Sequence, residues 1–209
     1  MGETVNRDLV AGPDGQLRCR WATAAPEYVA YHDDEWGRPV RDDRGLYEKL
    51  CLEAFQSGLS WITILRKREA FRTAFAGFEI ARVAAFGPGD EKRLLADAGI
   101  VRNRAKIEAT IANAKAIVEL RAAAEPFDAV VRAHAPAPRR SAPVAWADVP
   151  ASTPETVALA RELKRRGFRF VGPTTLYALM QACGLVNDHL AACPARPGVE
   201  RARQAAGLG

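Results

Sequence analysis

Two cysteines and two histidines near opposite ends of the chain carry the side chains that tetrahedral zinc prefers. His189 and Cys193 are four positions apart, a spacing that places an imidazole and a thiolate on one face of a single helical turn. Cys19 and His32 lie near the N-terminus and complete a Cys₂His₂ set. Such a set fills every position around the ion and leaves none for a reacting water, so the sequence predicts a structural zinc that ties the two ends of the fold together. The alternative is that the cysteines are free buried thiols and the histidine is a polar surface residue.

Aromatic and acidic residues are concentrated between Cys19 and Gly37. The large rings of this stretch are Trp21, Tyr28, Tyr31 and Trp36. Aromatic side chains of a core segment would not be accompanied by the acids of residues 33–35, so the wall of a ligand pocket is an equal alternative to simple core packing.

Glu53 is a candidate functional carboxylate. Asp42 or Asp43 can cap a helix that runs to about Ser57, and Glu53 lies at the edge of the apolar stripe of that helix. Its carboxylate is therefore either at the rim of the core or aimed into a cavity. Helix position alone favours a solvated glutamate.

Residues 163–189 place a short glycine-bracketed turn between two helical patterns, the arrangement of a helix-hairpin-helix. Gly167 ends the first pattern, and Pro173, after Gly172, suits the first turn of the second helix. Backbone amides at that helix start, with Arg169 beside them, can bind a phosphate group. The alternative is two core helices joined by a tight turn with a solvated basic edge.

No segment shows the alternation of a β-strand flanked by hairpin turns, so the sequence predicts an all-α fold with no sheet of consequence. Residues 1–17 and 194–209 are expected to be a flexible leader and a flexible tail. Residues 18–193 are expected to form one domain of two closely packed helical lobes. The proline-rich residues 134–150 are expected to connect helices over the surface.

Composition narrows the class of protein. The chain has 209 residues and a formal net charge of +5, with Arg and Lys clustered at 66–68, 102–106, 139–140 and 164–169, which suits a polyanionic partner. No apolar run approaches the roughly 18 residues of a membrane span, and the N-terminus lacks the apolar core of a signal peptide. We therefore expect a cytoplasmic protein whose four cysteines are thiols or metal ligands.

Several local motifs together resemble one family, 3-methyladenine DNA glycosylase I, over residues 18–193. The motifs are Cys-Arg-Trp (19–21), Tyr-His-Asp-Asp-Glu-Trp-Gly (31–37), Leu-Cys-Leu-Glu (50–53), Gly-Leu-Ser-Trp (58–61), Arg-Gly-Phe-Arg-Phe-Val-Gly (166–172) and Gln-Ala-Cys-Gly-Leu-Val-Asn-Asp-His (181–189). The resemblance implies a helix-hairpin-helix glycosylase fold with a bound zinc ion.

The resemblance also assigns roles to residues. The zinc ligands it implies are Cys19, His32, His189 and Cys193. Glu53, Tyr31 and Trp61 match base-pocket residues, with Tyr28, Trp21 and Trp36 nearby. The DNA-binding residues implied for the hairpin are Gly167, Arg169, Gly172 and Thr174. The chain departs from the family at Phe55-Gln56-Ser57 and at Pro173, and both departures concern contacts on the DNA side.

The function that the resemblance implies is hydrolytic excision of 3-methyladenine from alkylated double-stranded DNA by a monomeric, monofunctional glycosylase. The enzyme would flip the base out and hold the cationic ring among aromatic faces, with Glu53 as acceptor. A non-catalytic DNA-binding module is the first alternative, and it has no need of a carboxylate at an aromatic cavity. A glycosylase–lyase is the second, and the Pro173-Thr174-Thr175 stretch lacks the amine that a Schiff base requires.

Overall fold

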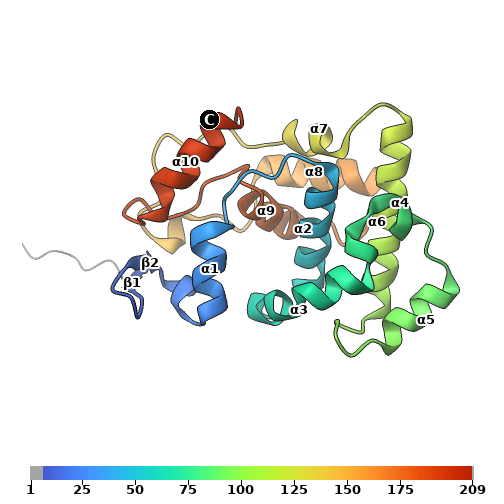
Figure 1. The fold of residues 1–209 in the computed structure, drawn as a ribbon. Helices are drawn as coiled ribbons and strands as arrows, with labels where there is room; N and C mark the ends of the chain where they lie inside the picture. Colours follow the sequence, from blue (N-terminus) through green and yellow to red (C-terminus); the bar gives the residue numbers. More distant parts are fainter. Residues whose placement is uncertain (1–6, 209) are drawn as a thin grey trace, which may run out of the picture. The chain divides into compact units, whose positions relative to one another are not determined.

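The computed structural model describes residues 7–208 and is mainly helical, as expected (Figure 1). The elements in chain order are β1 (Leu9–Ala11), β2 (Leu17–Cys19), η1 (Arg20–Thr23), α1 (Pro26–Asp34), α2 (Asp43–Gln56), α3 (Trp61–Ala74), η2 (Ala76–Phe78), α4 (Ile80–Ala84), α5 (Pro88–Ala96), α6 (Arg104–Ala122), α7 (Phe127–Arg132), η3 (Trp146–Asp148), α8 (Pro154–Arg165), α9 (Pro173–Ala182) and α10 (Ala195–Ala205). None of the helices among the described residues is both long and apolar enough to cross a bilayer.

The chain divides into two compact units, and each is assembled from separate stretches of sequence. The first unit comprises residues 1–39, 136–151 and 180–209, and the second comprises residues 40–135 and 152–179. The domain boundaries predicted from the sequence, at residues 17 and 193, do not coincide with the boundaries of these units. They stay a prediction.

In the first unit, residues expected to be a flexible leader form a β-hairpin. Strands β1 and β2 pair antiparallel, with Leu9 opposite Cys19 and Ala11 opposite Leu17. Buried Arg18 holds the hairpin by ion pairs of 2.7 Å to Asp14 and to Asp33 of α1. The expectation failed because a three-residue strand is too short to show alternation, and the part of the leader before residue 7 lies outside the described residues.

The expected flexible tail is also ordered, since residues 195–205 form α10. Arg203 of this helix is 5% exposed and donates to the carbonyls of Gly184 (2.8 Å) and Leu185 (3.3 Å). The helix is basic and has few large apolar residues, so the apolar pattern of the sequence did not indicate that Val199 and Arg203 would be buried.

The second unit is organised around α6, which packs against α2, α4, α5 and α7. Asn103 caps α6 by accepting from the Lys106 amide, and Asp42 caps α2 by accepting from the Gly45 amide, as the sequence predicted for residue 42 or 43. A run of buried rings fills the space beside α2, with centroids 4.6 Å apart for Phe55 and Phe71. These contacts fix the end of α2, where Glu53 lies.

Candidate functional site

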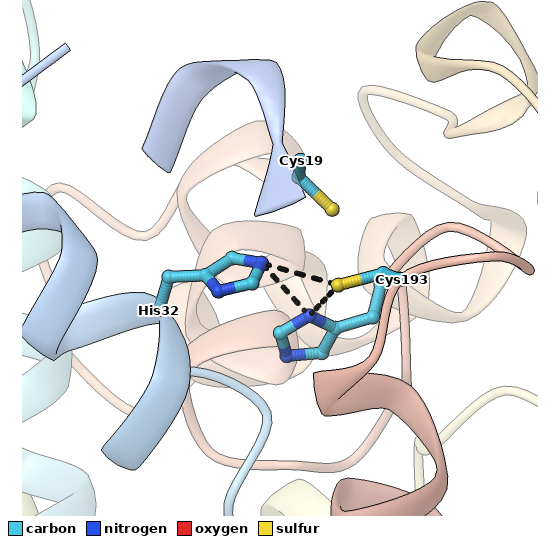
Figure 2. A group of neighbouring side chains, drawn as sticks. Cys19, His32 and Cys193 are labelled. Carbon is cyan, nitrogen blue, oxygen red and sulfur yellow. Dashed lines mark hydrogen bonds between the residues drawn. The ribbon is translucent and has the colours of Figure 1, made fainter. Parts of the chain in front are cut away.

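The Cys₂His₂ set comes together in the first unit. Cys19 ends β2, His32 lies in α1, and His189 and Cys193 lie in the loop before α10, all of them at most 2% exposed. Their ligand atoms lie within 4.8 Å of one another. Figure 2 shows the labelled side chains pointing to one place from separate segments of the chain. The cluster could therefore hold a metal ion.

The route to this geometry differs from the sequence expectation at one point. We expected His189 and Cys193 to share a helical turn, but residues 189–193 form an irregular turn in which the Cys193 amide donates to the Leu190 carbonyl at 2.8 Å. The Cys193 sulfur still lies 3.6 Å from Nδ1 of His189, because a non-helical turn also brings residues of this spacing together.

The outer hydrogen bonds of both histidines favour a cation at the centre. Nε2 of His189 faces the Trp36 carbonyl at 3.2 Å, and a carbonyl can only accept, so this nitrogen carries the hydrogen. Nδ1 of His32 lies 2.7 Å from the carboxylate of Asp33 and donates to it in the same way. The two inner nitrogens, 3.1 Å apart, then present lone pairs to each other. Such a pair is repulsive until a cation lies between, and this second layer is usual for metal-bound histidines.

The two thiols share the same preference for a cation. The hydrogen bond between them is the largest effect on both: it lowers the pKa of Cys193, with help from His189 and His32, and it raises the pKa of Cys19, with help from burial. The lowered pKa of Cys193 suits a metal ligand, because cysteine binds a metal ion as the thiolate.

The aromatic residues of the N-terminal segment surround this cluster. Trp21 lies edge-on to His32 at 5.3 Å, and Trp36 lies edge-on to His189 at 4.7 Å. Tyr28 and Tyr31 in turn contact Trp21 at 5.8 and 6.3 Å. Packing on the histidines accounts for Trp36, which is 6% exposed. The base-binding role expected for Trp36 thus has a structural alternative.

Trp21 also lines a surface hollow, in addition to its contacts with the other aromatic rings. Its indole N–H is buried without a hydrogen-bond partner among the described residues. The hollow has a volume of about 180 Å³ and is lined by Asp8, Arg20 and Trp146 as well. Trp146, from the proline-rich connection, also lies near Trp36, with ring centroids 6.4 Å apart.

Glu53 is buried in the second unit rather than solvated. It lies in the last turn of α2, is 6% exposed, and lines a hollow of about 240 Å³. Burial raises the pKa of its carboxyl to about 8, although the charge of Lys49, one turn earlier, opposes the rise. The alternative of an ordinary solvated helix glutamate is therefore wrong, since neutralisation by burial is the behaviour of a carboxyl kept from water.

The same hollow is lined by the start of α9. Its other walls are the turn after α2, residues 56–59, and Thr174, Thr175 and Ala178 of α9. Among the residues predicted to bind DNA, Thr174 is thus brought to Glu53. Trp61, the first residue of α3, follows this turn and is half-buried.

The hairpin, residues 166–172, joins α8 to α9. Gly167 has φ +88°, a left-handed conformation that favours glycine, whereas Gly172 is outside the left-handed region and has room for a Cβ. Of these two glycines, only Gly167 therefore has a backbone conformation that favours glycine. Leu176 makes the first helical hydrogen bond of α9, to the Gly172 carbonyl, which leaves the amides of the first turn without helical acceptors.

Two buried polar residues of α6 support these loops, and the sequence interpretation missed both. Lys106 donates to the carbonyls of Phe55 (2.9 Å) and Ser57 (2.6 Å), at the end of α2. Asn113 pairs with both backbone groups of Arg169 in the hairpin. The available signal was their place on the apolar side of α6, beside Ile107 and Ile111, where a polar side chain needs a partner.

Comparison with known proteins identifies related sequences over most of the chain. A sequence model of the methyladenine glycosylase family matches residues 21–196. DNA-3-methyladenine glycosylase 1 of Escherichia coli strain K12 is 47% identical over 182 residues, which are 87% of this chain and 97% of that protein. DNA-3-methyladenine glycosylase of Haemophilus influenzae is 42% identical over 182 residues, 86% of this chain and 97% of that protein.

Solved structures agree in three dimensions. A crystal structure of 3-methyladenine DNA glycosylase I matches with a TM-score of 0.82 and 47% identity, over 85% of this chain and 98% of that one. The enzyme from Staphylococcus aureus, solved to explain 3-methyladenine recognition, matches with a TM-score of 0.81 and 34% identity, over 86% and 96%. Fold and sequence thus define a helical base glycosylase. The chain belongs to the methyladenine glycosylase family.

Proposed function

We propose that this protein excises 3-methyladenine from alkylated double-stranded DNA by hydrolysis, as a monomer, in base excision repair. The relatives are named for this activity. The observation that carries the proposal is that the buried Glu53 lines a hollow that the first turn of α9 also lines. A carboxyl in that position can meet a base flipped out of a duplex held at the hairpin.

The chemistry suits the lesion. Methylation at N3 places positive charge on adenine and weakens the glycosidic bond, so the leaving base needs little acid catalysis and selection becomes the main task. A cationic base beside Glu53 offsets the burial that raises the pKa of this carboxyl to about 8, and so favours its ionised form. Neutral adenine offers no such gain, and the carboxylate accepts a hydrogen bond from the lesion.

The aromatic assignments rest on the resemblance. Tyr31 and Trp61 supply faces or edges to the flipped ring, with Tyr28 and Trp21 beside Tyr31, while Trp36 packs on the metal cluster. Cation–π attraction favours a charged methylated base over a neutral one.

The hairpin holds the DNA backbone. Arg169 is exposed beside the amides of the first turn of α9, and this combination binds phosphate without reading sequence. The helix-hairpin-helix is α8, residues 166–172 and α9. Gly172, which no backbone angle requires, leaves space for a phosphate to approach the chain.

Zinc is the ion that suits the cluster, held by Cys19, His32, His189 and Cys193. Sulfur and imidazole ligands in a closed set of four favour this metal, and the ion supplies cross-linking rather than chemistry. Cys19 and His32 bring the β-hairpin and α1 to the loop that precedes α10. The Asp33 carboxylate, held by Arg18, orients His32.

Lyase activity is the competing function. Lys106 is a buried amine beside the turn that lines the Glu53 hollow, and burial lowers its pKa. Its ammonium group donates hydrogen bonds to two backbone carbonyls, however, and these bonds keep it from attacking a sugar. Borohydride should trap no covalent complex between the protein and DNA.

The test of the proposed function is release of free 3-methyladenine from methylated duplex DNA under single-turnover conditions. The parent should release the base, and Glu53→Gln should slow release by about ten- to a hundredfold, because one charge-assisted hydrogen bond is lost in the transition state. Tyr31→Phe and Trp61→Ala are companions that probe the aromatic walls. Affinity for undamaged duplex should stay near that of the parent, since phosphate contacts do not involve Glu53. Release by Glu53→Gln at the parent rate would remove Glu53 from the reaction.

A further inference from the structure

Two phenylalanines of the second unit share an unfavourable backbone conformation but differ in what surrounds them. Phe78 and Phe170 both have φ +55°, in the left-handed region where a Cβ is crowded and glycine is favoured. Phe78 is fully buried and stacks on Phe75 at 5.7 Å, so packing offsets its backbone cost. Phe170 is 39% exposed, and burial does not offset its cost to the same degree.

The conformation of Phe170 is imposed by its neighbours. Asn113 is 1% exposed; its Oδ1 accepts from the Arg169 amide at 2.7 Å, and its Nδ2 donates to the Arg169 carbonyl at 3.1 Å. Phe168 and Val171 on either side are buried, and Phe168 stacks on Phe127 at 5.4 Å. Between these anchored neighbours, the side chain of Phe170 is left exposed.

Stability alone favours another residue at this position. Glycine would remove the crowding at φ +55°, and an exposed ring gives little packing in return. A residue that is held in a strained conformation by buried partners, and yet left exposed, indicates selection for a contact outside the chain. Phe170 lies in the hairpin, two residues before Gly172. The next residue, Pro173, is the first of α9.

We propose that Phe170 is a DNA-contacting residue and that Asn113 positions it. The ring packs against the deoxyribose next to the phosphate that the start of α9 holds, so that an apolar contact accompanies the charged one. The sugar is the same in every nucleotide, and the contact therefore adds affinity without reading sequence. This inference rests on the proposed function, because it takes duplex DNA as the partner.

The first experiment removes the aromatic ring and the backbone strain of residue 170 together. Phe170→Gly should weaken binding of a fluorescein-labelled duplex carrying one tetrahydrofuran abasic-site analogue by about tenfold, the effect of losing one well-placed aromatic contact. The same loss should appear with a duplex of different flanking sequence. The melting temperature should not fall, because glycine suits the left-handed backbone.

The control is Val118→Ala, which truncates an apolar side chain of α6 that is 40% exposed and should leave DNA affinity unchanged. Phe78→Gly should lower the melting temperature, since packing is lost there. Parent-like DNA affinity in Phe170→Gly overturns the proposal, and so does a fall in stability that accompanies the loss of affinity.

The second experiment separates positioning from general stability. Asn113→Ala should also weaken DNA binding, and in the double variant with Phe170→Gly the two losses should not add, because Asn113 acts through Phe170. Additive losses overturn the positioning role. Release of 3-methyladenine is measured on the same preparations: a parent that releases none overturns the proposed function. A parent that releases the base while Phe170→Gly binds duplex normally overturns this inference alone.

Discussion

Glu53 is a carboxyl held in its neutral form by the fold. Its pKa of about 8, against an ordinary value of 4.5, means that the folded chain binds more protons than the unfolded chain between these two pH values. The free energy of unfolding therefore falls as pH rises through this window. Burial of this carboxyl thus costs stability, as expected of a group that the proposed function assigns to a cationic base.

Glutamine at this position should remove that pH dependence. We expect Glu53→Gln and the parent to melt at similar temperatures near pH 4.5, with the variant increasingly more stable as the pH rises to about 8, because only the parent must keep a proton on folding that its unfolded chain has lost. Melting curves over this range test the expectation. Curves of the two proteins that stay parallel would show that Glu53 has an ordinary pKa.

At the scale of elements, α6 supports the turn after α2, which lines the Glu53 hollow, and the hairpin that leads into α9. Lys106 holds the end of α2, and Asn113 holds the hairpin. The carbonyls at a helix C-terminus lack helical partners, and an ammonium group bound to two of them fixes the turn that follows. The turn after α2 and the start of α9 can then keep one geometry around Glu53.

Lys106→Met should therefore affect excision as well as stability. The variant keeps the apolar stem but frees the Phe55 and Ser57 carbonyls, and a looser turn should slow 3-methyladenine release by about tenfold. Lys67→Met is the matched control, because Lys67 bonds in the same way to the carbonyls of Ala98 and Gly99, after α5. Both variants should melt earlier. Equal excision rates in the two would limit Lys106 to a stabilising role.

For the whole molecule, the Cys₂His₂ cluster joins chain segments that lie far apart in the sequence. Its ligands come from residues 19, 32, 189 and 193, so one ion would close a loop that contains most of the chain. Three segments of the chain, the β-hairpin, the loop after α9 and α10, would be joined by this cross-link.

Metal analysis should find about one zinc ion per chain, and Cys193→Ser should lose it. Each kcal/mol of lost stability lowers the melting temperature by about 2–4 °C in a chain of this size, so the loss should be visible as a shift of several degrees. Cys51→Ser is the control, since this buried thiol lies in α2 outside the cluster and its replacement should leave zinc content unchanged. A metal-free parent of full stability would contradict a structural ion.

Local chemistry made part of this protein predictable. Helix starts followed from side chains that cap within a few residues, as at Asp42, and the ligand set followed from residue types that few other roles combine. Short strands and basic helices carry no such local signal. Residues 9–17 and 195–205 were therefore expected to be flexible, although the pairing of β1 with β2 and the buried Arg203 hold them.

The sequence by itself determined the helical class, the resemblance to one family, and which residues could bind metal, base or phosphate. Only the tertiary structure decided the state of those residues. Helix position left Glu53 on the border between solvent and core, and the tertiary structure made it a buried carboxyl of raised pKa at a hollow that the turn after α2 and the start of α9 also line. Asn113 and Arg169, the neighbour of the strained Phe170, are distant in sequence, and a hydrogen bond between distant segments leaves no periodic pattern in either.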